Sequence, residues 1–218
     1  MNNVDAKLLV KKVFDRIKSA KSVSDFDNIV DDDPILQKNK FNSSKYPNLK
    51  INISTNDITK LKKLNILSDE NKILPLTDSL DLSPLEKLLY SVLWKNGDLG
   101  KEKHIVEGVL ASEDDDNSSK ERGLVFYQYG KHLAKREEPI VDQHTIRAFL
   151  LFKNIESEDS EITKIRKKDT LKNDELLNFI TWIKSSEIGG IDNQFHIDKV
   201  LFSLGKAVKI TKRSEGVT

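Results

Sequence analysis

Apolar residues recur at the spacing of an α-helix along most of this chain. Leu9, Val13 and Ile17 form one such stripe, and Val200 and Leu204 belong to another near the C-terminus. Residues three and four apart lie on the same face of a helix, so each stripe predicts a helix that buries one side. The pattern therefore predicts a mainly α-helical, bundle-like domain of about seven or eight helices.

The expected helices are separated by polar segments that are rich in turn-forming residues. They cover residues 4–18, 56–64, 83–95, 101–110, 120–134, 142–153 and 195–208, with a further helix that begins at Thr170 or Asn173 and ends before Gly189. We expect the stretch from Asp31 to Asn48 to be mostly loop, because it is rich in Asp, Asn, Ser and Pro. One small β-hairpin is expected near residues 65–77.

The clearest helix start in the sequence is Ser83-Pro84-Leu85-Glu86. Serine at the N-cap, proline at the first helical position and glutamate at the third together satisfy unpaired amides and preset the first φ angle. The helix carries a broad apolar face and ends at Asn96-Gly97. We expect this face to lie in the core.

The composition is that of a globular protein with a highly charged surface. With 218 residues, 37% hydrophobic and 33% charged, the chain is expected to form a single domain, residues 1–218, with a possible N-terminal subdomain over 1–80. The absence of cysteine excludes disulfides and thiolate zinc sites. No apolar run reaches the length of a signal core or a membrane span, so we expect a cytoplasmic protein without a membrane partner.

The charges nearly cancel, with 36 Lys plus Arg against 35 Asp plus Glu and a net charge of +1. Any contact with nucleic acid therefore has to use a local basic patch. Three clusters are candidates: Lys60, Lys62 and Lys63; Lys131, Lys135 and Arg136; and Lys164, Arg166, Lys167 and Lys168. Helix faces and loops that are merely exposed to solvent also carry such clusters of lysine and arginine.

One short segment bears a resemblance to a known family. Val141-Asp142-Gln143-His144-Thr145-Ile146-Arg147 follows a proline turn and opens a helix. The Val-Asp-x-His-x-x-Arg order is similar to the segment that carries the essential aspartate in helix-hairpin-helix DNA glycosylases, which flip a base and cleave its glycosidic bond. The resemblance implies a catalytic role for Asp142 and a double-stranded DNA partner contacted by Lys120, Arg122, Lys131, Lys135 and Arg147.

The chain departs from that family in two places. Its hairpin region reads Ser118-Ser119-Lys120-Glu121-Arg122-Gly123, with one glycine in place of a Leu-Pro-Gly-x-Gly turn, and the stretch after it contains no lysine nucleophile. The resemblance therefore implies a divergent DNA-binding protein with monofunctional glycosylase activity. Asp142 has a second reading, as a helix N-cap whose carboxylate accepts hydrogen bonds from the first turn.

The alternative function is a non-enzymatic helical interaction or regulatory protein. Residues 54–77 resemble the end of a winged-helix module, in which a helix precedes a β-hairpin, and could read DNA without chemistry. We expect no metal and no cofactor. His104, His132, His144 and His196 lie on separate elements, and the acidic runs lack the spacing of a calcium loop.

Overall fold

The computed structural model describes residues 1–44, 51–74, 82–114, 123–185 and 193–211. Within these residues the regular elements are 11 helices, and strand pairing is limited to one antiparallel bridge between Leu67 and Ile73. The mainly α fold class is confirmed. The expected number of helices was too low, and the expected β-hairpin was wrong, because only a single bridge forms there.

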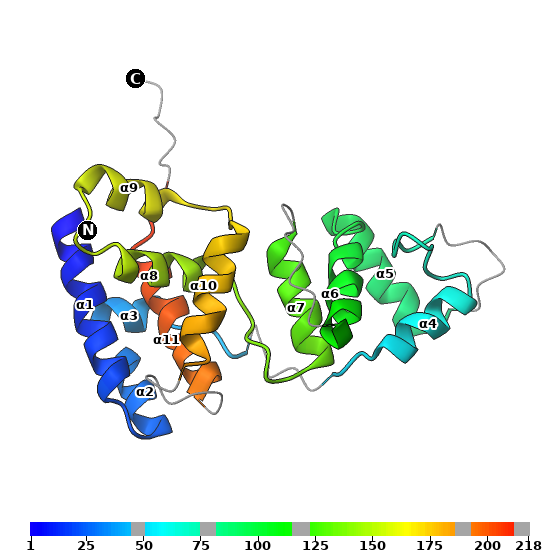
Figure 1. The fold of residues 1–218 in the computed structure, drawn as a ribbon, viewed down its shortest axis with the longest axis horizontal. Helices are drawn as coiled ribbons and strands as arrows, with labels where there is room; N and C mark the ends of the chain where they lie inside the picture. Colours follow the sequence, from blue (N-terminus) through cyan, green and yellow to red (C-terminus); the bar gives the residue numbers. More distant parts are fainter. Residues whose placement is uncertain (45–50, 75–81, 115–122, 186–192, 212–218) are drawn as a thin grey trace. The chain divides into compact units, whose positions relative to one another are not determined.

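The helices fall into two compact units that we describe separately. Unit 1 comprises Met1–Leu49 and Pro139–Thr218, and unit 2 comprises Lys50–Glu138. Unit 1 holds α1 (Asn3–Ser19), α2 (Val23–Asp31), α3 (Pro34–Lys38), α8 (Gln143–Lys153), α9 (Asp159–Lys167), α10 (Asn173–Ile183) and α11 (Gln194–Ala207). Unit 2 holds α4 (Thr55–Lys63), α5 (Pro84–Asn96), α6 (Glu102–Asp114) and α7 (Leu124–Ala134) (Figure 1). The expectation of one domain over 1–218 stays a prediction.

Three of the helices were not expected from the sequence. α3 lies inside the segment expected to be loop, where Asp33 accepts hydrogen bonds from the amides of Ile35 and Leu36 and Pro34 occupies the first turn. α2 begins with a capping box between Ser22 and Asp25. α9 lies in the charged segment between the expected helix over 142–153 and the one expected to begin at Thr170 or Asn173. The capping residues were present in the sequence, but these helices are too short to show a long apolar stripe.

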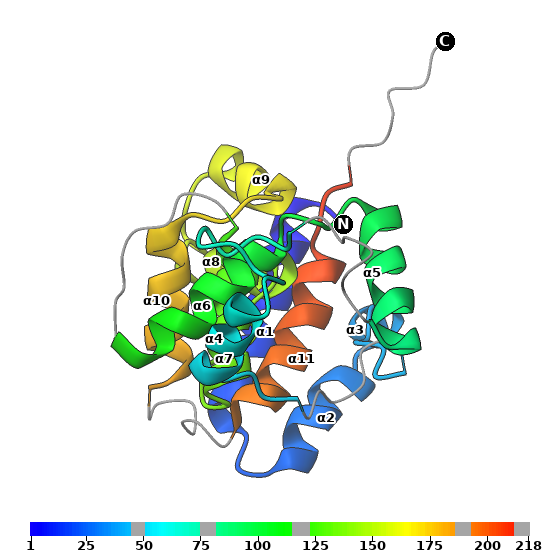
Figure 2. The same ribbon diagram turned by 90° about the vertical axis from the view of Figure 1, so that its right-hand side faces the viewer.

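The core of unit 1 forms around α8, which packs against α1, α9, α10 and α11 (Figures 1 and 2). Phe149 is 1% exposed and its ring lies 5.4 Å from that of Phe179 and 5.3 Å from that of Trp182. On the neighbouring side, the rings of Phe14 and Phe152 stack with centroids 3.9 Å apart. Aromatic side chains bury large areas, so these rings account for much of the hydrophobic stabilisation of this unit.

In unit 2, the antiparallel helices α6 and α7 pack closely against each other. A Cβ atom added at Gly108 would lie 2.0 Å from the carbonyl oxygen of Tyr127, and one added at Gly130 would lie 2.1 Å from that of Ile105. Only glycine allows two backbones to approach this closely. Gly130, which lowers the intrinsic helix propensity of α7, is therefore explained by packing.

Helix α5 begins and ends as the sequence predicts, but its apolar face is not in the core. Ser83 and Glu86 form the expected capping box, Pro84 lies in the first turn, and Gly97 closes the helix with φ +67°. None of its residues is buried, and Leu85, Leu88 and Leu89 are 63%, 62% and 53% exposed. The expectation of a core face was wrong, because periodicity predicts which side of a helix is apolar and not what covers it.

The close approach of α6 and α7 predicts an unusual effect of alanine at position 130. Gly→Ala in an open helix position normally stabilises by up to about 1 kcal/mol. We expect Gly130→Ala to destabilise unit 2 by about 1–3 kcal/mol, because the new methyl group meets the backbone of α6. Urea denaturation followed by circular dichroism measures this, and a stabilised variant would contradict the packing described.

The exposure of α5 predicts a small effect at Leu89. Leu89→Ala is expected to change the free energy of unfolding by less than about 1 kcal/mol, because truncating a solvent-facing leucine leaves no cavity. Phe149→Ala, by contrast, should cost about 3–5 kcal/mol. The same denaturation experiment compares the two, and a loss at Leu89 as large as that at Phe149 would place α5 in a core.

Candidate functional site

Asp142 is the N-cap of α8. Its Oδ1 accepts hydrogen bonds from the backbone N–H groups of His144, at 2.6 Å, and Thr145, at 2.8 Å. Oδ2 has no hydrogen-bond donor among the residues that the structure describes. The helix N-terminus favours a negative charge at this position. The cap geometry is therefore present, and it leaves one carboxylate oxygen available for other chemistry.

Arg147 is buried and holds three segments of unit 1 together. Its side chain is 0% exposed, and Nη1 donates to the carbonyl oxygen of Gly205 at 3.1 Å while Nη2 donates to that of Lys168 at 2.6 Å. Nη2 also lies 3.5 Å from the carboxylate of Asp169. The predicted role of Arg147 in DNA binding is corrected here, since its guanidinium faces protein carbonyls and is not presented to a phosphate.

His144 connects Asp142 to Arg147. Its Nδ1 lies 2.9 Å from Nη1 of Arg147, which can only donate, so Nδ1 is the acceptor and the ring is neutral in this arrangement. Burial lowers the pKa of His144, an effect that the charge of Asp142 partly opposes. The ring also packs edge-on against Phe202, with centroids 5.0 Å apart. In the Asp-x-His-x-x-Arg order, Asp142 caps the helix, His144 contacts Asp142 through its backbone and Arg147 through its ring, and Arg147 is buried.

A second carboxyl group, Asp198 of α11, belongs to the same site. Its Oδ1 accepts a hydrogen bond of 2.9 Å from the hydroxyl of Thr145 on α8. Burial raises the pKa of Asp198 to about 7, and the nearby charge of Asp142 adds to this effect. Asp198 keeps part of its surface accessible to solvent, although its carboxyl lies deep among protein atoms. Thr145 therefore contacts both carboxyl groups, through its backbone N–H to Asp142 and through its hydroxyl to Asp198.

Close contact between α8 and α11 fixes this arrangement. A Cβ atom at Gly205 would lie 1.8 Å from the carbonyl oxygen of His144, so the two helices meet there without an intervening side chain. Asp198 lies about two turns before Gly205 and hence on the same face of α11. The contact at Gly205 brings that face, and the carboxyl of Asp198, against the first turn of α8.

A paired carboxylate and carboxylic acid can do acid–base work at neutral pH. An ionised carboxylate opposes positive charge that develops in a transition state, while a protonated neighbour can donate a proton to a leaving group. Glycoside hydrolysis uses two carboxyl groups in these two roles. The site therefore has the residue types for cleaving a glycosidic bond, with Asp142 and Asp198 as candidates.

The other expected DNA contacts lie in unit 2 or outside the described residues. Lys120, Arg122 and most of the segment expected to form the hairpin lie outside the described residues. Lys135 is exposed, and the ammonium group of Lys131 lies 5.5 Å from the ring centre of Tyr127. The neighbouring Arg136 donates to Asn52 and to the carbonyl oxygen of Ile51, at 2.8 and 2.6 Å, and so holds the chain that precedes α4. DNA contacts by the two lysines stay predictions.

The remaining candidate groups add no further site among the described residues. No three histidine or acidic side chains there gather as metal ligands. None of the helices described combines the length and apolar character needed to cross a bilayer. In α4, the cation of Lys60 lies 3.8 Å from Asp57, and Lys62 donates to the carbonyl oxygen of Asp69 at 3.4 Å.

Sequence reasoning missed Asp198 and Thr145. The two residues are on different helices and far apart in the sequence, so no local motif contains both. The one available signal was an acidic residue between Ile197 and Val200, two apolar positions of the expected helix. Such a residue is costly to bury unless it finds a hydrogen-bond partner.

Asp198 predicts a pH dependence of stability. The raised pKa of about 7 compares with 3.8 for an unperturbed aspartate, so the folded protein binds an extra proton between these values. The free energy of unfolding should therefore fall as pH rises through this window. Asp198→Asn keeps an oxygen for Thr145 and removes the ionisation, so it should be more stable than the wild type above pH 7, by at most about 4 kcal/mol.

The measurement is urea denaturation at pH 4, 6 and 8 for both proteins. Asp15→Asn, which alters an exposed aspartate on α1, serves as the control. Parallel pH profiles for the wild type and Asp198→Asn would mean that Asp198 ionises normally.

No family model, no curated protein and no solved structure matches this chain. The resemblance to glycosylases therefore has no support beyond the residues of the segment 141–147. Of these, the structure gives Asp142 a position at the start of a helix and gives His144 and Arg147 contacts that hold that helix in place.

Proposed function

We propose that this chain binds DNA and hydrolyses the glycosidic bond of a base, with Asp142 as the catalytic carboxylate. The observation that carries the proposal is the pairing of Asp142, which caps α8 through Oδ1 alone, with Asp198, whose pKa is raised to about 7. The close helix pair α6 and α7 precedes Asp142 in the chain, in the order that the glycosylase resemblance implies.

In the proposed reaction the bond between C1′ of the sugar and the base nitrogen breaks as a water molecule attacks C1′. Asp142 opposes the positive charge that develops on the sugar and accepts a proton from the water. The departing base accepts a proton from solvent, since the carboxyl of Asp198 lies deep among protein atoms. Residues 123–126, at the start of α7, contain no lysine, so the proposal is a monofunctional hydrolase without a covalent intermediate at that position.

The alternative is a non-enzymatic interaction protein, and the exposed apolar face of α5 favours it. A contiguous apolar helix face in water is typical of surfaces that contact other molecules. Binding to duplex DNA separates both readings that involve DNA, the enzyme and the winged-helix-like reader of residues 54–77, from a protein that contacts no DNA. The proposed enzyme should bind at low salt and lose affinity as salt is added, because phosphate contacts release counterions. Absence of binding at low salt would leave the interaction protein.

The proposal predicts that Asp142→Asn abolishes catalysis while leaving the fold intact. Asparagine caps a helix about as well as aspartate, so we expect a loss of stability below about 1 kcal/mol. A neutral amide cannot oppose the developing positive charge, and base release should fall by at least about 100-fold. The assay measures base release from duplexes that carry deaminated, oxidised or alkylated bases, beside thermal melts of both proteins.

Asp33→Asn is the matched control, because Asp33 is the N-cap of α3 and donates no group to the Asp142 site. It should retain base release. If the wild-type protein releases no base from any duplex, or if Asp142→Asn releases base as fast as the wild type, Asp142 is a helix cap and the proposed function is wrong.

A further inference from the structure

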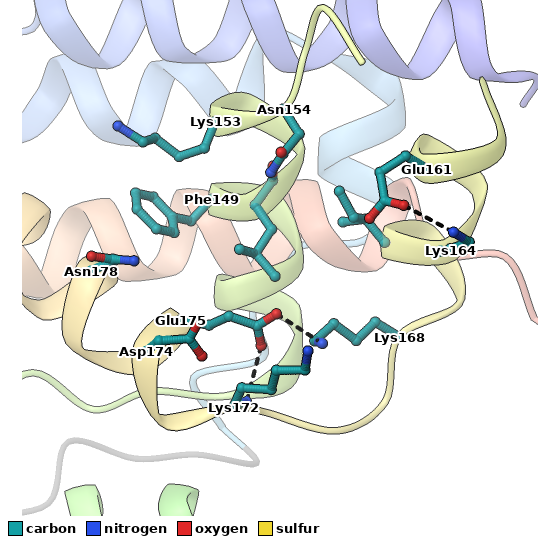
Figure 3. A pocket seen from close by; sticks show the side chains of 12 residues that line it. Phe149, Lys153, Asn154, Glu161, Lys164, Lys168, Lys172, Asp174, Glu175 and Asn178 are labelled. Atoms are coloured by element: carbon teal, nitrogen blue, oxygen red, sulfur yellow. Dashed lines mark hydrogen bonds and ion pairs between the residues drawn. The ribbon is translucent and has the colours of Figure 1, made fainter. Parts of the chain in front are cut away.

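A cleft of about 520 Å³ lies in unit 1 between α8, α9 and the start of α10 (Figure 3). Its volume is within the range of sites that hold small organic molecules. The side chains of Phe149, Leu150 and Ile165 contribute an apolar part of its lining. The rest of the lining is polar and comes from the three helices and the segment that joins α9 to α10.

The cleft is lined by four lysines from these elements, namely Lys153, Lys164, Lys168 and Lys172. Three carboxylates also line it, from Glu161, Asp174 and Glu175, so its side chains carry an excess of one positive charge. Lys164 pairs with Glu161 at 3.2 Å, and Lys168 pairs with Glu175 at 2.9 Å. The second pair is the more enclosed one, with side chains 20% and 16% exposed.

Each carboxylate oxygen of Glu175 has a partner. Oε1 contacts the ammonium group of Lys168, and Oε2 accepts the backbone N–H of Lys172 at 3.0 Å. The side chain of Lys172 points toward that of Lys168 in Figure 3, and no carboxylate among the described residues pairs with it. Among the described residues, the ammonium group of Lys172 therefore has no carboxylate paired with it, although the carboxylate of Asp174 also lines this end of the cleft.

The geometry points to a binding site for a small phosphate monoester, with its phosphate at Lys168 and Lys172 and its organic part against Leu150. A phosphate has several acceptor oxygens and can therefore bond to both ammonium groups at once. The same chemistry is offered by a free metabolite and by the terminal phosphate of a nucleic acid strand. This site is separate from Asp142 and does not depend on the proposed function.

The test measures binding of adenosine 5′-monophosphate to the full chain by calorimetry, with ¹H–¹⁵N spectra to locate the affected amides. We expect binding of the monophosphate, weaker binding of inorganic phosphate and none of adenosine. Lys172→Gln should weaken binding by about fivefold or more, since it removes one charge-assisted contact. Lys167→Gln, an exposed lysine of α9 that does not line the cleft, should stay within about twofold of the wild type.

Glu175→Gln supplies a test of opposite sign. Glutamine can still accept the N–H of Lys172 but no longer neutralises Lys168, so the monophosphate should bind about fivefold more tightly. A 5′-phosphorylated oligonucleotide that binds more tightly than the monophosphate, with the same response to Lys172→Gln, would identify the strand terminus as the source. The reverse order would identify a free metabolite.

The proposal is wrong if the wild type does not bind the monophosphate, or if Lys172→Gln binds it as tightly as the wild type does. The spectra show whether each variant is folded, so a loss of binding through unfolding is recognised. Asp142→Asn should bind the monophosphate normally, so a failure here and a failure of the glycosylase proposal are distinguishable.

Discussion

The hydrogen bonds of Arg147 are the interaction on which the candidate site most depends. One guanidinium joins the interior of α8 to the carbonyl oxygens of Gly205 on α11 and Lys168 at the end of α9. Hydrogen bonds from a charged group to buried carbonyls are stronger than neutral ones, and removing the donor would leave buried acceptors without partners. The first turn of α8, with Asp142 and Thr145, is held against α11 by this anchor and by the glycine contact beside it.

Much of the fold could be predicted from the sequence, since apolar periodicity and capping residues are local signals. The limits of α5 were predicted from Ser83, Pro84 and Gly97 alone. What covers each apolar face depends on contacts between distant segments, so the exposed face of α5 could not be predicted from its periodicity. Short helices such as α3 were missed because a single turn of apolar residues is indistinguishable from a loop.

Some residues of the candidate site could likewise be predicted from local sequence, and others could not. Asp142 could be identified because proline, aspartate and an apolar stripe follow one another in the chain. Asp198 could not, because its partner Thr145 is on another helix and its proton affinity arises from burial that only the folded state creates. The role of Arg147 was likewise misjudged, since an arginine in a sequence does not reveal whether it faces solvent or carbonyl oxygens.

The insertion of unit 2 between the two segments of unit 1 has a consequence for synthesis on the ribosome. Phe14 of α1 stacks on Phe152 of α8, which emerges only after the whole of unit 2 has been made. The helices α1 to α3 can contact one another but must wait for α8 and α11 to complete their packing, while α6 and α7 can pair as soon as they are translated. Domains generally fold as units when their sequence is complete, so nascent chains that end before α8 are the ones most exposed to aggregation and to chaperones.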